Sequence, residues 1–171
     1  IDMLRARGAS PVVLSRGHGG TQDGPHLVDE DDTAADVGDE PVMLSAFAPV
    51  IVAKDRVAGA RKAIEIGADV IVMDDGFQDP SLAKDLSILV IDGQVGFGNR
   101  RLLPAGPLRE SIAAGIARAD LALLIGGEVG RADLAALPTS TGMIAPLATG
   151  MPWNGLRVVA FAGIGRPEKF F

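Results

Sequence analysis

An apolar run that ends in two acids constrains the fold of this chain most. Residues 70–73 read VIVM, and Asp74, Asp75 and Gly76 follow directly. Four apolar residues are too few for a buried helix, whereas a buried parallel strand is typically a short continuous run of this kind. In open α/β sheets, ligands bind outside the carboxyl ends of the strands. The sequence therefore predicts a strand that delivers carboxylates to a ligand-binding edge.

Two interpretations of this acid pair stay open. An acid at such an edge of a nucleotide-binding fold holds Mg2+ against phosphate oxygens, directly or through water. Alternatively, Asp74 and Asp75 cap the next turn, since Asp-Gly is a common turn signal. Adjacent side chains of a strand point to opposite faces, so the two acids are expected to have different roles. One is expected to reach the metal and the other to orient it or its surroundings.

The composition limits the fold and the class of partner. The chain has 171 residues, of which 47% are hydrophobic and 4% aromatic, which suits one well-buried α/β domain. Its net charge of −6 argues against a nucleic-acid partner and favours a small or lipidic one. It has no cysteine, which excludes disulfides and thiolate metal sites. No apolar run is long enough to span a bilayer and no signal peptide is visible, so we expect a soluble chain.

Short apolar runs alternate with helical patterns along the chain. This alternation predicts right-handed βαβ crossovers, and hence a mostly parallel sheet with helices on both faces. Both termini are expected to fall within a fold rather than at its boundary. We expect strands at 11–15, 48–53, 69–73, 86–91, 121–125 and 158–161, and helices at 33–47, 54–66 and 110–119, with a further helix beginning at Pro167. In the helix at 33–47, Pro41 is either tolerated near the start or marks a break.

A glycine-rich loop, RGHGG at 16–20, follows the first expected strand. Its glycines would let the backbone approach a phosphate or a sugar while Arg16 neutralises charge, although His18 could simply fill a gap. The loop lacks the GxxxxGK[ST] pattern and is therefore no P-loop.

Beyond this loop, His26 has no partner in the sequence and is expected at the surface. The acidic stretch at 29–32 is expected in a solvated loop rather than at a metal.

Two further segments carry candidate chemistry. In the segment GDEP at 38–41, two acids precede a proline, which fits helix capping and a favourable helix dipole. The alternative makes Asp39 a general base, which needs an acceptor hydroxyl within hydrogen-bond reach. The segment at 98–110, GNRRLLPAGPLRE, is a long loop of the kind that is often functional. There Arg109 could grip an anionic oxygen, and Glu110 could join the metal or cap the next helix.

Taken together, SRGHGG at 15–20, GDEP at 38–41, DDGFQ at 74–78 and the segment at 98–110 closely resemble the tetraacyldisaccharide 4'-kinase family, the lipid A kinases. Their order and spacing match over nearly the whole chain, and AGIGRP at 162–167 resembles that family's entry into its second half. The resemblance implies a P-loop-kinase-like α/β fold. It also implies ATP- and Mg2+-dependent phosphorylation of the 4'-hydroxyl of a tetraacyldisaccharide 1-phosphate at the cytoplasmic face of the inner membrane.

The same resemblance implies roles for individual residues. Asp74 corresponds to the magnesium-binding acid, Asp75 to its active-site neighbour, and Asp39 to the base that activates the acceptor hydroxyl. Arg56 and Arg109 match positions near the disaccharide phosphate, and Glu110 matches a magnesium contact. This assignment requires Asp39 and Asp74 to lie on the same side of the molecule.

The chain also departs from that family's pattern. The family's P-loop and membrane anchor would precede Ile1, so no residue here is assigned to nucleotide binding, and an Asp-His motif that supports the base would lie beyond Phe171. His18 replaces a usual tyrosine, and Asp79-Pro80 stands where His or Asn often follows the glutamine. We therefore expect residues 1–155 to be the central part of the kinase-like domain and 156–171 to enter the next half. We expect these residues alone not to turn over ATP.

Two other classes of protein are alternatives to a kinase. A receiver-type signalling domain also gathers acids around Mg2+, but it needs a lysine at the end of a later strand. The segments at 121–127 and 158–165 offer none. A non-catalytic sugar- or lipid-binding module suits a chain without a P-loop, yet it explains the acid pair poorly.

Overall fold

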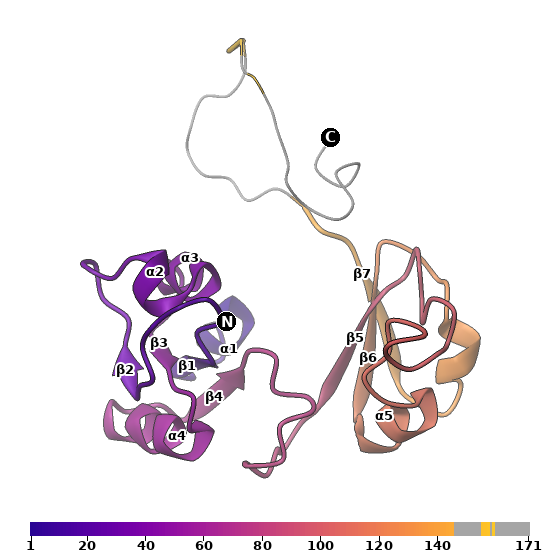
Figure 1. The fold of residues 1–171 in the computed structure, drawn as a ribbon, viewed down its shortest axis with the longest axis horizontal. Coiled ribbons are helices and arrows are strands. Elements are labelled where there is room, and N and C mark those ends of the chain that lie inside the picture. The colour runs from indigo at the N-terminus through magenta and orange to yellow at the C-terminus, as the bar shows by residue number, and fades with distance from the viewer. Residues whose placement is uncertain (146–154, 158, 160–171) are drawn as a thin grey trace.

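The chain forms two sheets, each with its own helices (Figure 1). The computed structural model describes residues 1–145, 155–157 and 159. The first sheet and its helices comprise α1 (Asp2–Arg5), β1 (Pro11–Ser15), β2 (His26–Leu27), α2 (Ala34–Val37), α3 (Asp39–Ser45), β3 (Val50–Val52), α4 (Arg56–Glu65) and β4 (Val70–Met73). The second part comprises β5 (Ile88–Asp92), α5 (Ile112–Arg118), β6 (Leu121–Ile125), the 3-10 helix η1 (Arg131–Leu134) and β7 (Thr139–Gly142).

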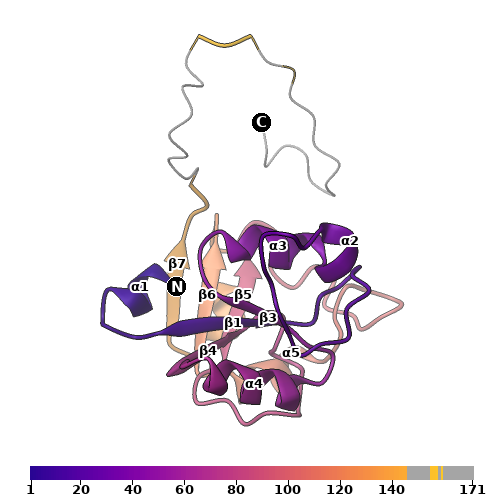
Figure 2. The ribbon, with the colours of Figure 1, turned by 90° about the vertical axis from the view of Figure 1, so that its left-hand side faces the viewer.

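Strand β1 is an inner strand of the first sheet, whose order is β2-β3-β1-β4. It pairs in parallel with β3 and β4, and β2 is antiparallel to β3. Figure 2 shows α2 and α3 on one side of these strands and α4 on the other. Val12 and Leu14 join the core that includes α4, whereas Val13 joins the core that includes α2. All of β1 is buried, as expected of a parallel strand covered on both faces.

Helix α4 follows β3 and begins next to the carboxyl ends of the strands. Its N-cap residue Asp55 accepts hydrogen bonds from the amides of Val57 and Ala58, at 2.9 and 3.1 Å. This cap satisfies amides that have no partner within the helix and fixes Arg56 as the first helical residue.

Among the helices of the described residues, none has both the length and the apolar character that a membrane span requires.

The second sheet is entirely parallel, in the order β5-β6-β7. Its core consists of Ile91, Ala122, Leu124 and Leu134. Along β5 the apolar side chains alternate: Leu89 and Ile91 pack on the core, while Ile88 and Val90 are exposed at 42% and 58%. One face of β5 is thus solvent-exposed among the described residues.

The α/β class with parallel strands and helices on both faces is confirmed. The strands expected at 11–15 and 121–125 have the observed bounds, but the expected helix at 33–47 is broken at Gly38, whose φ is 93°. The division into two sheets and the elements β2, η1 and β7 were not predicted. Of the strand expected at 158–161, the structure describes Val159 alone, which is exposed and assigned to no strand. The helix expected from Pro167 lies outside the described residues, and the domain boundary at 155 stays a prediction.

Candidate active site

The carboxyl ends of β1 and β4 lie side by side because the two strands are parallel neighbours. Leu14 pairs with Met73, and the amide of Asp74 continues this ladder by donating to the Leu14 carbonyl at 3.0 Å. Asp75 then adopts a left-handed backbone with φ of 49°, so the chain turns sharply after Asp74. Asp74 is half-buried and Asp75 is exposed. The two acids therefore occupy different environments, at the edge where the sequence predicted a ligand.

Two side chains from other elements hold Asp74. The hydroxyl of Ser15, the last residue of β1, donates to Oδ2 of Asp74 at 3.0 Å. The guanidinium of Arg56 donates through Nη2 to the Asp74 carbonyl at 2.8 Å and through Nη1 to the Leu14 carbonyl at 2.7 Å. Asp74 is thus bound through its carboxylate, its amide and its carbonyl.

Arg56 is buried, with 3% of its surface exposed. Burial lowers its pKa, while the charges of Asp79 and Asp74 oppose this shift and Arg16 adds to it. The nearest acid is Asp79, whose Oδ2 lies 3.8 Å from the Arg56 Nε. The guanidinium of Arg56 is directed at the ends of two strands rather than at solvent. This position does not support a contact between Arg56 and a substrate phosphate, which stays a prediction.

The glycine-rich loop packs directly on the junction between α2 and α3. A Cβ on Gly17 would lie 2.4 Å from a methyl carbon of Val52, and one on Gly38 would lie 2.6 Å from the His18 carbonyl oxygen. The glycines are therefore required for the close packing of this loop on β3 and on the α2–α3 junction, whatever ligand the loop binds. Arg16 and His18 are exposed in this loop.

This packing brings the start of α3 to the same edge as Asp74. The pKa of Glu40 is raised, first by the negative charge of Asp74, and then by burial, Asp75 and Asp39, while His18 opposes the shift. Asp39 is exposed, and its Oδ1 accepts from the Glu40 amide at 3.1 Å. The structure thus gathers Asp39, Glu40, Asp74 and Asp75 at one edge. Their catalytic and metal-binding roles stay predictions.

Glu110 and Arg109 lie beside the second sheet, at the start of α5. The Glu110 carboxylate accepts from Gln78 at 3.1 Å and from Arg118 at 2.5 Å. Arg118 also lies over the Phe77 ring, 5.1 Å from its centroid. Glu110 does not cap the helix, because Ser111 is the N-cap and accepts from the Ala114 amide. Glu110 instead ties the segment after Asp75 to α5, and its metal role stays a prediction.

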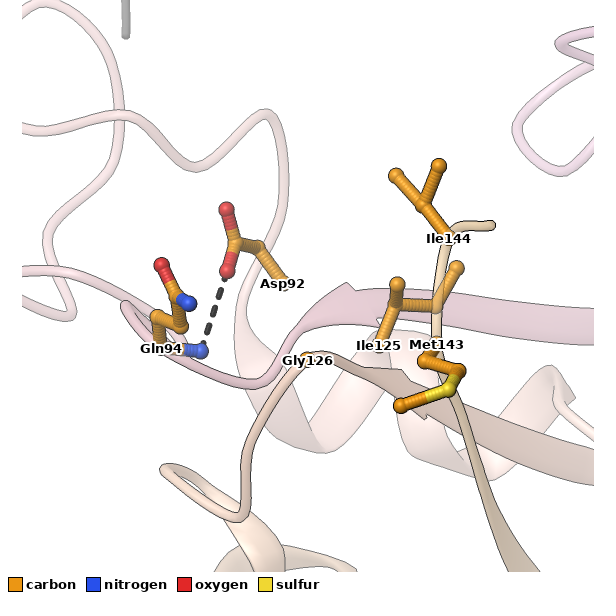
Figure 3. A pocket seen from close by; sticks show the side chains of 6 residues that line it. All are labelled: Asp92, Gln94, Ile125, Gly126, Met143 and Ile144. Carbon is orange, nitrogen blue, oxygen red and sulfur yellow. Dashed lines mark hydrogen bonds between the residues drawn. The ribbon is translucent and has the colours of Figure 1, made fainter. Parts of the chain in front are cut away.

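Arg109 is exposed and lines a small cavity of about 90 Å³ together with Phe77 and Glu110. A larger cavity of about 210 Å³ lies at the carboxyl ends of β5 and β6 (Figure 3). Its polar wall is formed by Asp92 and Gln94, and Oδ1 of Asp92 accepts from the Gln94 amide at 3.0 Å. An acid again ends a parallel strand here, in the second sheet.

His26 is not the unpartnered surface residue that the sequence predicted. It is half-buried in β2, and its Nε2 lies 2.7 Å from Oδ2 of Asp32. The same Asp32 oxygen accepts from the Asp29 amide at 2.8 Å, so the acidic stretch forms a folded turn. His26, Asp29 and Asp32 present possible ligand atoms within 4.8 Å of one another, but they are also each other's hydrogen-bond partners.

Asp32 gives a pH-dependent contribution to stability. The Asp29 amide first, and then His26, hold its pKa below the ordinary value of 3.8. A lowered folded pKa stabilises the fold above the unfolded pKa, and this stabilisation is lost as pH falls through the folded pKa. We expect Asp32→Asn to lower Tm at neutral pH. We also expect the Tm of this variant to fall less than that of the wild type as the pH is lowered towards about 2. Thermal unfolding across pH checks this, and an equal acid dependence in Asp32→Asn and in the exposed control Asp31→Asn would contradict it.

Sequence reasoning missed two residues of this edge, Ser15 and Glu40. Ser15 lies in the motif at 15–20 without an assigned role, although a serine that ends an apolar strand next to a strand followed by an acid is a usable signal. In the segment at 38–41, the sequence pattern assigns chemistry to Asp39 and none to Glu40.

Parallel strands with acids at their carboxyl ends, a glycine-rich loop and helices on both faces define an α/β fold of the nucleotide-binding type. The family model described as Tetraacyldisaccharide-1-P 4'-kinase matches residues 1–171, and the chain belongs to this family.

The chain is 56% identical to the tetraacyldisaccharide 4'-kinase of Dinoroseobacter shibae over 99% of its own length and 53% of that protein. It is 54% identical to the one of Rhodospirillum centenum, over 100% of this chain and 52% of the relative. The chain thus spans about half the length of the curated relatives it matches. The "apo" form of LpxK from Aquifex aeolicus, solved in complex with ATP, aligns with a TM-score of 0.67 and 29% identity, over 82% of this chain and 47% of that one.

Proposed function

We propose that the protein containing this chain transfers the γ-phosphoryl group of ATP to the 4'-hydroxyl of a tetraacyldisaccharide 1-phosphate, a lipid A precursor. The family match along residues 1–171 carries this proposal. The edge that joins Asp74 to the start of α3 supports it, because phosphoryl transfer depends on positioning and charge stabilisation. No comparison favours a receiver domain or a binding module.

The residues at this edge fit a magnesium ion. Carboxylate oxygens are hard ligands of the kind Mg2+ takes, and Mg2+ is commonly held by one or two carboxylates together with phosphates and water. The raised pKa of Glu40 shows that like charges accumulate here, and a cation would relieve them. Asp74 would hold the ion, with Asp75 beside it. Glu110, the further contact that the family resemblance implies, lies at the start of α5 and is bound to Gln78 and Arg118. Bound there, Mg2+ would neutralise and orient the phosphate oxygens of ATP.

Asp39 is the proposed base for the acceptor hydroxyl. Its carboxylate is exposed at the first residue of α3, where a substrate can approach it. Arg16, in the loop packed on this helix junction, and Arg109 are exposed cations suited to the anionic groups of the substrate.

We further propose that the enzyme works at the cytoplasmic face of the inner membrane. The support is the chemistry of the substrate, because acyl chains gain about 0.8 kcal/mol per buried CH₂ and keep such a molecule in a bilayer.

The test of this function is phosphoryl transfer by the full-length protein. Purified protein is incubated with radiolabelled ATP, Mg2+ and tetraacyldisaccharide 1-phosphate in mixed micelles, and the labelled lipid is separated. We expect label at the 4' position only when protein, Mg2+ and acceptor are all present. Label that never reaches the lipid would refute the proposed function.

Asp39→Asn tests whether Asp39, rather than the neighbouring Glu40, is the general base. Loss of a general base typically costs about 10²–10⁴-fold, so we expect kcat to fall within that range with little change in KM for ATP. Asn keeps the side-chain size and the hydrogen bond to the Glu40 amide, so stability should change little. Glu40→Gln is the matched neighbour, and a larger loss of kcat in it than in Asp39→Asn would assign the base to Glu40 instead.

A further inference from the structure

We propose that Ser15 and Arg56 are positioning residues that fix the carboxylate of Asp74 for its metal ion. The inference rests on the proposed function, in which Asp74 binds Mg2+. It assigns a role to Ser15, which had none, and gives Arg56 a role other than contact with the substrate.

The direction of the Ser15 hydrogen bond follows from its surroundings. Ser15 is buried, with 2% of its surface exposed. Its Oγ accepts from the Gly17 amide at 3.4 Å, and the hydroxyl has one proton to give. The neighbour that can only accept is the ionised carboxylate of Asp74, at 3.0 Å. The hydroxyl therefore bonds one carboxylate oxygen, Oδ2, and sets the rotation of the whole group.

Arg56 acts on the backbone of the same residue. Its two terminal nitrogens donate to the carbonyls of Leu14 and Asp74, which end adjacent strands. A planar guanidinium can hold two acceptors at a fixed separation, as a lysine ammonium cannot. Its burial at 3% exposure leaves these carbonyls as its hydrogen-bond partners, and its Nε is buried without one.

The two contacts together fix both the main-chain and the side-chain conformation of Asp74. Arg56 holds the main chain just before Asp75 turns into its left-handed conformation, and Ser15 holds the side chain. Groups that orient a metal ligand commonly change metal affinity or activity by about 10–100-fold when they are removed. The contacts made by Ser15 and Arg56 place both residues in this class.

Ser15→Ala in the full-length protein tests the side-chain contact. Binding of Mn2+ as a probe is measured by electron paramagnetic resonance in the presence of ATP, and the Mg2+ concentration for half-maximal activity is measured in parallel. We expect the Kd for Mn2+ and the Mg2+ concentration for half-maximal activity each to rise by about tenfold or more. KM for the lipid acceptor should be unchanged, and Ser15→Thr, which keeps the hydroxyl, should recover much of the effect. The control is Ser45→Ala, whose hydroxyl donates to the Val42 carbonyl within α3, and wild-type values are expected.

Arg56→Lys tests the main-chain contact and keeps the charge. We expect a weaker Mn2+ affinity and a lower Tm, because one ammonium cannot serve both carbonyls as the guanidinium does. Wild-type Mn2+ affinity in folded Ser15→Ala and Arg56→Lys would overturn the inference, even with a lowered Tm. If the wild-type protein bound Mn2+ but phosphorylated no lipid, the proposed function would fail while the metal measurements still decided the roles of Ser15 and Arg56.

Discussion

Asp74→Asn is expected to abolish most phosphoryl transfer by the full-length protein. Asn preserves the size of the side chain and can still accept from the Ser15 hydroxyl, but it removes the negative charge at the end of β4. Loss of one preorganised electrostatic contact typically costs about 10²–10³-fold in kcat. We expect a loss of this size, which higher Mg2+ concentrations restore only in part. Steady-state kinetics at several Mg2+ concentrations measure it.

The matched control for this change is Asp85→Asn, the same substitution at an exposed acid that precedes β5. It should leave kcat and the Mg2+ requirement unchanged. Near wild-type activity of Asp74→Asn would contradict the assignment of Asp74 to the metal and would favour the interpretation in which the acid pair merely caps a turn.

Gly17→Ala is expected to destabilise the first sheet far more than Gly19→Ala. Both glycines lie in the same loop with positive φ, 68° and 83°, so both substitutions carry left-handed strain of about 1–2 kcal/mol. A Cβ on Gly17 would also lie 2.4 Å from Val52 Cγ1 and 3.0 Å from the Val37 carbonyl oxygen, whereas nothing lies within 4 Å of one on Gly19. Overpacking of this kind adds about 1–3 kcal/mol.

Denaturant unfolding of the two variants measures this difference in the free energy of unfolding. Relief of the clash with Val52 would shift the Gly17 amide, which donates to Ser15. Gly17→Ala should therefore also weaken Mn2+ binding, and Gly19→Ala should not. Equal stabilities of the two variants would show that the loop does not pack on Val52 as the structure has it.

The parts of the fold that the sequence predicted are those governed by local pattern. Strands such as β1 and β6 are continuous apolar runs, and the acids after β4 were expected at a strand end. A break in the helix at 33–47 was one alternative, but at Pro41 rather than at Gly38. The sequence could not place it at Gly38, because there the His18 carbonyl approaches closely, a contact between segments twenty residues apart. The strand β2 has two residues and β7 reads TSTG, and neither carries a hydrophobic pattern that marks a strand.

The candidate site was predicted to a similar extent. The sequence placed Asp39, Asp74 and Asp75 in the right region because they follow helix and strand boundaries. It could not predict that Arg56 turns inward, since a cation at the start of a helix is usually solvated and only the neighbouring strand carbonyls account for its burial. Nor could it predict the bond of Ser15 to Asp74, which joins residues 59 positions apart.

The edges of the two sheets have a consequence for handling the chain by itself. Among the described residues, β4 pairs with β1 and β5 with β6, so each leaves one side of its backbone unpaired. Both strands are rich in Val and Ile, and Val90 of β5 is largely exposed. An unpaired apolar strand is a template for the addition of another strand, from the same protein or from a second molecule. Unless another strand occupies these positions, aggregation through them is the hazard to expect at high concentration.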